Sequence, residues 1–485
     1  MTCDLHLGSN ANGFGSKVNQ QIARGLTVDW PRSFVKWLLI HNSCSTPMAN
    51  PTFRQLLHYH CGLRPPQGRS TYALVLKLTC ALLVPMAGYA SDWPQFLGPT
   101  RNGVYSGSDL VQHWASEGPP VVWLKAIGHG FSGPAVADRQ LVLFHRLGDR
   151  ETVECLDART GRSIWTFDYP TTYQDDFGFD DGPRATPCIM EGRVYTFGAQ
   201  GMLHCLDAKS GNKLWNVDLK SEFQAENGFF GMACSPLVEG NAVLLNIGGT
   251  KGAGIVAIDK TNGKLLWKTS EDEASYSSPV AATIADRRYA LFFTRNGFIA
   301  ADPVTGKIRF QYPWHSRIRT SVNAATPLIL GDTIFLSACY GTGAILLRLH
   351  DSELEKLWSG DDLLSNHYAT SVEKDGFLYG IHGRTDPGYH PGPKLRCIDL
   401  KTKKMVWETD SIGAATITRA GARLLILREN GELVDAAATP EGFQLRNRSQ
   451  ILHSQVRAFP AVADGFFYAR SKDQLVCVDL SAAAK

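Results

Sequence analysis

Residues 155–161, Cys-Leu-Asp-Ala-Arg-Thr-Gly, stand four positions before Trp165, and this phrase decides the fold because the chain repeats it. Further copies are 205–211 (CLDAKSG) before Trp215, 257–263 (AIDKTNG) before Trp267, 300–306 (AADPVTG) before Phe310 and 397–402 (CIDLKT) before Trp407. Weaker copies lie at 349–358, 434–435 and 478–479. A repeat at this interval is typical of propellers and solenoids.

A second marker opens each unit as a small residue beside Pro, Ser or Thr. The markers stand at 133–134, 186–187, 235–236, 278–279, 326–327, 370–371, 415–416 and 459–460, spaced by 43 to 53 residues. Between two markers the pattern predicts four short strands joined by Gly-bearing turns, which is one antiparallel propeller blade. We therefore expect an all-β, eight-bladed β-propeller of four-stranded blades. Seven blades remain the alternative, because the unit at 413–443 is weak.

The consensus has a physical reading at each position. Asp and Thr accept backbone hydrogen bonds within a turn, and Gly takes the positive φ that the turn requires. The aromatic residue then lies on the outer strand, where we expect it to wedge between neighbouring blades. The last unit ends at 477–480 without such a strand, whereas residues 120–125 (PVVWLK) supply one at the other end of the chain. We expect this N-terminal strand to complete the last blade and close the ring.

The phrase Asp-x-x-Thr-Gly-x-x-x-Trp with an eight-fold count resembles the PQQ-binding-like β-propeller repeat family. That family includes quinoprotein alcohol dehydrogenases and BamB-like assembly proteins. Residues 93–99 (WPQFLGP) also resemble the start of many secreted bacterial members. The resemblance covers nearly everything after residue 91 and implies the fold more strongly than an activity, because the repeat is structural.

The first ninety residues lack the repeat. Residues 71–90 (TYALVLKLTCALLVPMAGYA) combine a basic flank, an apolar run and a small-x-small end, which is the pattern of a secretory signal peptide. We expect residues 1–70 to be an unstructured extension or to precede the true translation start, and residues 91–485 to be the propeller. This organisation predicts a periplasmic or secreted bacterial protein without a transmembrane anchor in the mature chain.

Charge argues against a nucleic-acid partner. The full chain carries a formal charge of +3 at pH 7, but residues 1–90 hold eight of the 49 Lys and Arg and two of the 46 Asp and Glu. Residues 91–485 are therefore near −3, without the basic excess that nucleic acid requires.

Several motifs that suggest chemistry are accounted for by the repeat. Cys155, Cys205, Cys397 and Cys477 occupy the same repeat position, so we expect buried thiols in separate blades. Pairing among the other propeller cysteines, at 188, 234 and 339, stays open. The Gly-rich run 248–254 aligns with a turn and lacks the helix of a phosphate loop. The tryptophans are expected to be wedges.

Segments that precede each first strand are the candidate site, because they converge at one mouth of the central channel in this fold class. They are rich in polar and aromatic residues, although solvation of turns alone would explain the Asp and Ser. The candidate ligand-binding residues are Asp180, Asp181, Arg184, Glu226, Asn227, Phe229, Tyr276, Arg317, Arg319, Asn323, His367, Tyr368 and Arg457. Three of these arginines, 317, 319 and 457, beside aromatic rings suit a flat anionic ligand. The insert 384–393 is either a partner contact or decoration.

The resemblance leaves two functions open. A quinoprotein dehydrogenase implies PQQ, an adjacent Cys-Cys pair, Glu and Asn calcium ligands and an Asp base; Asp180 or Asp181 would be that base, and Glu226 with Asn227 the ligands. The sequence contains no Cys-Cys dipeptide. We therefore expect a non-catalytic binding or scaffold module for a cell-envelope protein, a peptide or a small anionic ligand, with no metal or catalytic residue assigned. A PQQ-dependent alcohol or sugar dehydrogenase with a divergent, calcium-bearing site is the alternative.

Overall fold

The computed structural model describes residues 92–481 except 319–320, 351–352, 387 and 454. The extension expected at 1–70 and the signal peptide expected at 71–90 lie outside the described residues. The described residues belong to one of two compact units of the chain, Met86–Lys485. None of the helices in the described ranges is long and apolar enough to cross a membrane.

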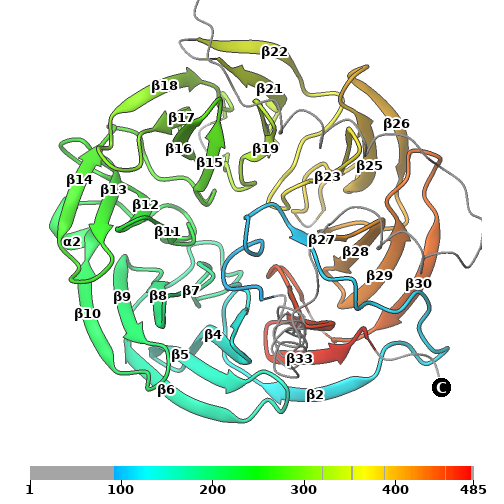
Figure 1. The fold of residues 1–485 in the computed structure, drawn as a ribbon, viewed down its shortest axis with the longest axis horizontal. Coiled ribbons are helices and arrows are strands. Elements are labelled where there is room, and N and C mark those ends of the chain that lie inside the picture. The colour runs from blue at the N-terminus through cyan, green and yellow to red at the C-terminus, as the bar shows by residue number, and fades with distance from the viewer. Residues whose placement is uncertain (1–91, 319–320, 351–352, 387, 454, 482–485) are drawn as a thin grey trace, which may run out of the picture. The chain divides into compact units, whose positions relative to one another are not determined.

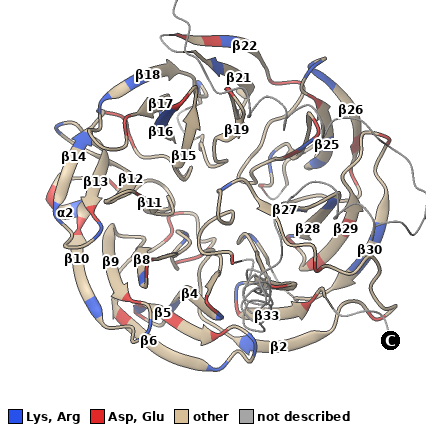
Figure 2. Cartoon of the chain, in the orientation of Figure 1, with Lys and Arg blue, Asp and Glu red and all other residues tan. Residues whose placement is uncertain are grey.

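Eight antiparallel sheets surround a central channel and form an eight-bladed β-propeller (Figure 1). In blades 1 to 7 four consecutive strands run from the channel to the outer rim, as the repeat predicted, and blade 8 takes its outer strand from the N-terminal part of the propeller. The weak unit at 413–443 forms a full blade, so the alternative of seven blades is wrong. The inner strands β3, β7, β15, β19 and β31 contain no charged residue, and charges gather on the outer strands and connections (Figure 2).

The first four blades have the following strands. Blade 1 contains β3 (Ala135–Ala137), β4 (Gln140–Leu147), β5 (Arg150–Asp157) and β6 (Ser163–Pro170). Blade 2 contains β7 (Cys188–Met190), β8 (Arg193–Phe197), β9 (Met202–Asp207) and β10 (Lys213–Asp218), followed by helix α2 (Leu219–Phe223). Blade 3 contains β11 (Leu237–Glu239), β12 (Ala242–Gly249), β13 (Ala253–Asp259) and β14 (Leu265–Thr269). Blade 4 contains β15 (Val280–Ile284), β16 (Arg287–Phe293), β17 (Gly297–Ala301) and β18 (Ile308–Pro313).

The remaining blades follow the same order. Blade 5 contains β19 (Leu328–Leu330), β20 (Thr333–Ala338), β21 (Gly343–Leu349) and β22 (Leu354–Gly360). Blade 6 contains β23 (Val372–Lys374), β24 (Phe377–His382), β25 (Lys394–Asp399) and β26 (Lys404–Thr409). Blade 7 contains β27 (Ala415–Ala420), β28 (Arg423–Arg428), β29 (Glu432–Ala437) and β30 (Leu445–Gln450). Blade 8 contains β31 (Ala461–Ala463), β32 (Phe466–Arg470), β33 (Gln474–Asp479) and the N-terminal β2 (Val121–Ala126).

The ring closes through its two chain ends. Strand β2 pairs antiparallel with β33, with Trp123 opposite Cys477, and completes blade 8 as predicted (Figure 1). A second N-terminal strand was not foreseen. β1 (Val104–Tyr105) pairs in parallel with β27 and makes blade 7 five-stranded. Both additions cover edges that would otherwise be open to intermolecular pairing.

The repeated Asp organises the turn between the third and fourth strands. Asp157 Oδ1 accepts hydrogen bonds from the Thr160 N–H at 2.8 Å and the Thr160 hydroxyl at 2.8 Å. Asp207 makes the same pair of contacts with Ser210, at 2.8 and 2.7 Å. Because these contacts favour the carboxylate, the hydrogen bonds from Ser210 hold the pKa of Asp207 below its ordinary value.

The tryptophans are wedges between blades. Trp165 Nε1 donates to the Ala208 carbonyl of the next blade at 2.9 Å. Its ring lies over Gly211, where a Cβ would approach the ring to 2.5 Å. The same bond recurs from the tryptophans at 123, 215, 267 and 407 to residues 158, 260, 303 and 439. Each such ring buries apolar area that stabilises the blade interface by about 1.5–3 kcal/mol.

The small residue two positions before Asp faces the tryptophan across the sheet. Cys155 pairs with Trp165, and Cys205 pairs with Trp215. A small side chain leaves room for the indole at this register. All seven cysteines in the described ranges are buried free thiols, so the disulfides left open among the propeller cysteines are absent there. The Gly-rich run 248–254 forms the turn between β12 and β13, as predicted.

The Ser and Thr of the second marker tie the inner strands together. The Thr186 N–H donates to Ser235 Oγ at 3.0 Å, and the Ser235 N–H donates to Ser278 Oγ at 2.9 Å. Gly133 bonds to Thr186 Oγ1 in the same way at 3.1 Å. Around the wall of the channel, the hydroxyl of each of these blades therefore accepts a hydrogen bond from a backbone N–H of the preceding blade.

A segment ahead of the first blade fills the channel. Residues 93–103, called the plug below, contact several blades. Trp93 forms an isolated β-bridge with Val136 of blade 1, and the Pro94 carbonyl accepts a hydrogen bond from the Ile189 N–H of blade 2. Arg101 is 2% exposed and donates to the carbonyls of residues 235, 236 and 279, while its Nε donates to Gln95 Oε1 at 2.9 Å. Burial lowers the pKa of Arg101 to about 10, so the guanidinium stays charged at neutral pH.

Candidate functional site

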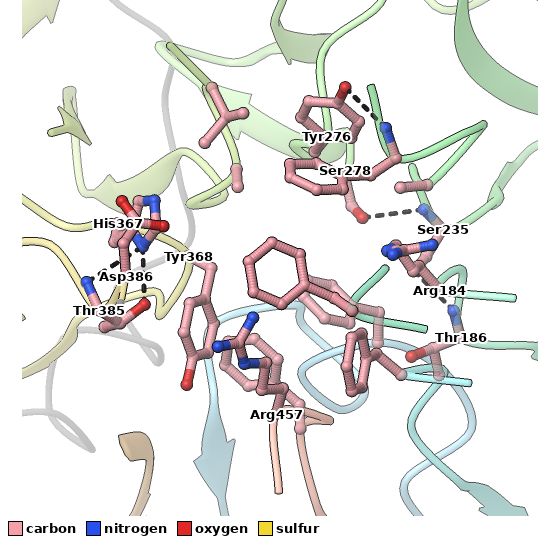
Figure 3. A pocket seen from close by; sticks show the side chains of 18 of the residues that line it. Arg184, Thr186, Ser235, Tyr276, Ser278, His367, Tyr368, Thr385, Asp386 and Arg457 are labelled. Carbon is pink, nitrogen blue, oxygen red and sulfur yellow. Dashed lines mark hydrogen bonds between the residues drawn. The ribbon is translucent and has the colours of Figure 1, made fainter. Parts of the chain in front are cut away.

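The connections that lead into the inner strands enclose a cavity of about 180 Å³, called the mouth pocket below (Figure 3). Its lining includes eight aromatic residues: Phe96, Phe131, Phe179, Phe230, Tyr276, Tyr340, Tyr368 and Phe459. The polar and charged lining residues are Arg184, Thr186, Ser235, Ser278, His367, Thr385, Asp386 and Arg457. Aromatic rings with a few convergent polar groups are the usual makeup of a small-molecule site.

The plug forms the floor of the pocket. Phe96 packs edge-to-face against Phe459 with ring centroids 5.0 Å apart. Both rings line the cavity, and Arg101 is anchored beneath them by three backbone carbonyls. The pocket is therefore blind, and a ligand has to enter from the face that carries the connections.

Two arginines stand over the aromatic wall. The guanidinium carbons of Arg184 and Arg457 lie 5.5 and 5.8 Å from the centre of the Phe131 ring. Arg457 also lies 4.8 Å from the centre of Phe179. These distances are those of cation–π contacts, which hold the guanidinium groups beside the rings.

Both arginines of the pocket lining are ion-paired. Arg184 Nη2 lies 2.8 Å from Asp175 Oδ2, and the Asp175 side chain is fully buried. Arg457 Nε donates to Glu429 Oε1 at 2.5 Å. These carboxylates offset much of the positive potential, so the pocket is less attractive to a free anion than the sequence suggested.

Hydroxyl groups line the wall formed by blades 2 to 4. Thr186, Ser235 and Ser278 each accept a backbone N–H, as described for the channel wall. A hydroxyl that accepts one bond keeps its own hydrogen for donation. The three groups line the cavity (Figure 3) and are suited to oxygen acceptors on a ligand.

A hydrogen-bonded chain forms the opposite wall (Figure 3). His367 Nδ1 lies 2.7 Å from Thr385 Oγ1 and 3.3 Å from the Thr385 backbone nitrogen, so Thr385 holds this side of the ring. Nε2 lies 2.8 Å from Tyr340 Oη. Burial lowers the pKa of His367 to about 4, which keeps the imidazole neutral at physiological pH.

The pocket holds one lining carboxylate. Asp386 accepts a hydrogen bond from Arg384 Nε at 2.7 Å, and the positive charge of Arg384 offsets its negative charge. Within the described ranges, no three His, Cys, Asp or Glu side chains gather where they would hold a metal ion.

Five of the thirteen predicted residues line the mouth pocket: Arg184, Tyr276, His367, Tyr368 and Arg457. Asp180 is buried and accepts the Gly182 N–H at 2.7 Å, while Asp181 accepts the Asp175 N–H at 2.7 Å. Asn323 is 1% exposed and donates to the Thr294 carbonyl at 2.8 Å. These three therefore support the connections rather than the cavity.

The remaining predicted residues lie elsewhere. Glu226, Asn227 and Arg317 are exposed and do not line the cavity, and Phe229 packs against Phe177 at 5.9 Å. Arg319 lies outside the described residues. The pair Glu226 and Asn227 is thus away from the position expected of calcium ligands in the pocket.

Sequence reasoning missed six of the eight aromatic rings of the pocket: Phe96, Phe131, Phe179, Phe230, Tyr340 and Phe459. Phe96 and Phe131 precede the first repeat, and Phe459 belongs to a marker, so the repeat pattern did not single them out. Phe230 lines the cavity, whereas Phe229, which was expected there, packs against Phe177. The sequence signal available for Phe96 was its place in the WPQFLGP segment.

Comparison with known proteins agrees with the architecture. A family profile described as outer membrane protein assembly factor BamB matches residues 149–409, more than half of the chain. No curated protein sequence matches the chain.

Solved structures share the fold at low identity. The BamB of Moraxella catarrhalis is 15% identical with a TM-score of 0.55, over 74% of this chain and 97% of that one. The quinohemoprotein alcohol dehydrogenase of Comamonas testosteroni is 15% identical with a TM-score of 0.59, over 81% of each chain. Another, ADHIIG from Pseudomonas putida HK5, is 13% identical with a TM-score of 0.56, also over 81% of each chain. Together with the family match and the eight-bladed ring, these similarities show that the chain belongs to the PQQ-like β-propeller family that includes BamB.

Proposed function

We propose that this chain is a non-catalytic binding propeller of the bacterial cell envelope, and that its mouth pocket holds a flat ring compound bearing acceptor oxygens. The observation that carries the proposal is the composition of the blind pocket. Eight aromatic residues provide stacking surfaces, and the hydroxyls of Thr186, Ser235 and Ser278 provide donors. Aromatic carboxylates and quinones combine both properties.

The charges support a binding role over catalysis. The pocket's lining carboxylate, Asp386, is paired with Arg384, and the imidazole of His367 is hydrogen-bonded through both ring nitrogens, to Thr385 and to Tyr340. A hydride-abstracting site needs an available base within reach of the substrate. Neither group offers one in this arrangement.

The envelope location rests on the signal-like segment 71–90 and on the description of the family as an outer membrane assembly factor. N-terminal sequencing of the mature protein tests it. Cleavage after residue 90 is the expected result, and a mature chain that begins before residue 71 would count against export through this segment.

The competing function, a PQQ-dependent alcohol or sugar dehydrogenase, draws on the fold shared with the quinohemoprotein alcohol dehydrogenases. Calorimetric titration of the purified 485-residue chain with PQQ, with and without calcium, separates the two. We expect binding whose affinity does not depend on calcium, and no reduction of a dye acceptor when alcohols or sugars are added. Calcium-dependent binding with dye reduction would establish the dehydrogenase instead.

A further inference from the structure

Four phenylalanines form an apolar patch beside the mouth pocket. Phe177, Phe179, Phe229 and Phe230, called the phenylalanine patch below, come from the connection between β6 and β7 and from the one that follows α2. Phe177 lies 5.9 Å from Phe229 and 5.3 Å from Phe230 between ring centroids, and Phe179 lies 6.0 Å from Phe230. The rings form one continuous cluster across two blades.

This cluster is exposed where large apolar side chains are ordinarily covered. Phe177 is 55% exposed, and Phe229 is half-buried although it belongs to a loop with polar neighbours. Phe179 and Phe230 turn their other edges into the mouth pocket. Contiguous exposed apolar residues with a polar rim mark protein-binding surfaces, because leaving them in water costs free energy that a partner recovers.

The rim of the patch is acidic. Segments 171–187, 219–236 and 270–279 carry six exposed carboxylates, and their two basic residues, Arg184 and Lys220, are half-buried. The carboxylates are Asp176, Asp181, Glu222, Glu226, Glu271 and Glu273. The neighbouring turn between β12 and β13 adds one exposed base, Lys251. The negative potential around the patch therefore favours a positively charged partner.

We propose that the phenylalanine patch docks a cationic, apolar segment of a partner protein, in which Lys or Arg alternates with large aliphatic or aromatic side chains. The apolar side chains cover the phenylalanines, and the basic side chains meet the acidic rim. The surface is separate from the cavity at Phe177 and Phe229, so this inference stands apart from the ring compound of the proposed function.

The test uses three synthetic peptides of about twelve residues, a length that spans an interface patch of this kind: alternating Lys and Leu, alternating Glu and Leu, and alternating Lys and Ser. Fluorescence anisotropy with the purified full chain measures their affinity at low and high salt. We expect only the Lys-Leu peptide to bind, with affinity that falls at least about tenfold in high salt. Equal binding of the Glu-Leu peptide, or no binding of the Lys-Leu peptide, would overturn the proposal.

Variants localise the site. The double variant Phe177→Ser and Phe229→Ser should weaken the Lys-Leu peptide at least about tenfold, and Glu226→Lys with Glu273→Lys should weaken it similarly. Val304→Ser is the control, because Val304 is 81% exposed in the turn that precedes β18, at the opposite end of that strand from the connections. Unchanged affinity in the double variant, or an equal loss in the control, would contradict docking at the patch.

Folding and self-association are measured separately. Thermal melting of each variant reports folding, and we expect a cooperative transition in every variant because Phe229 is half-buried and the other substituted positions are exposed. Sedimentation of the wild type reports self-association. If the wild type is a dimer that binds no peptide, and the double variant is a monomer, the patch is a contact between copies and the proposal is refuted. Titration of the double variant with PQQ should match the wild type, so loss of peptide binding alone separates this inference from the proposed function.

Discussion

The glycine of the blade turn is required for two reasons, its positive φ and its close contact with a tryptophan ring. Gly211 has φ of 73°, which L-residues with a side chain rarely adopt, and Trp165 of the preceding blade lies over it. The phrase Thr-Gly followed by Trp is therefore a contact between units as well as a turn. Gly161 and Gly263 repeat this arrangement with Trp123 and Trp215.

Replacing such a glycine should destabilise the propeller by more than the positive φ alone would predict. Gly211→Ala brings a Cβ within 2.5 Å of the Trp165 ring and should destabilise the propeller by about 2–4 kcal/mol. Gly331→Ala is the matched control, because Gly331 has φ of 66° with open space around it and should lose about 1–2 kcal/mol. Urea denaturation measures both, and equal losses would contradict the role of the indole contact.

The turn carboxylates make stability depend on pH. Hydrogen bonds from Ser210, Thr261 and Thr402 hold the pKa values of Asp207, Asp259 and Asp399 below their ordinary value. A depressed folded pKa contributes stability above the unfolded pKa, near about 4, and that contribution is lost as pH falls through the folded pKa.

We therefore expect the melting temperature of the wild type to fall as pH drops below about 4. The variant Asp207→Asn should fall less steeply over that range, because it has one carboxylate fewer to protonate. Differential scanning calorimetry at a series of pH values measures both slopes. Identical slopes would show that the turn bond does not stabilise the carboxylate.

The plug is the element that turns an open channel into a pocket. Arg101 contributes the larger part of this closure, since its guanidinium satisfies carbonyls on blades 3 and 4 and fixes the floor. A planar fork with several donors fits several carbonyls, whereas an ammonium offers a single point of charge. The plug and β2 together make the N-terminal part of the propeller integral to the ring.

Arg101→Lys should consequently be a costly substitution. It leaves at least one buried carbonyl without a donor, and we expect a loss of about 2–4 kcal/mol by urea denaturation. Arg162→Lys, at an exposed position of a blade turn, should change stability by less than about 0.5 kcal/mol. A neutral result for Arg101→Lys would mean that the plug is held by its apolar residues alone.

The elements show why the sequence predicted the ring more fully than the site. Strand count, closure by β2 and the tryptophan wedges follow from local patterns that recur from unit to unit. Phe96, Phe131 and Arg101 occur once, outside the repeat, and their partners are set by where the chain crosses the channel. The pairing of Arg184 with Asp175 likewise depends on the path of a single connection, which no period in the sequence records.

At the scale of the whole propeller, the features that differ from blade to blade lie on one face. Blade interfaces, turns and inner strands are built from repeated contacts, while the mouth pocket and the phenylalanine patch are built from connections that differ from blade to blade. The same face thus carries a blind aromatic cavity and an exposed apolar surface with an acidic rim. Binding at this face is the activity that the arrangement favours.

The most direct test of the binding account is a calorimetric comparison of two ligands with the same tricyclic shape. Anthraquinone-2-carboxylate carries acceptor oxygens on its central ring, and anthracene-2-carboxylate lacks them. The hydroxyls of Thr186, Ser235 and Ser278 should make the quinone bind at least about tenfold more tightly. Absence of binding by both ligands, or equal affinity for the two, would contradict the account of the mouth pocket.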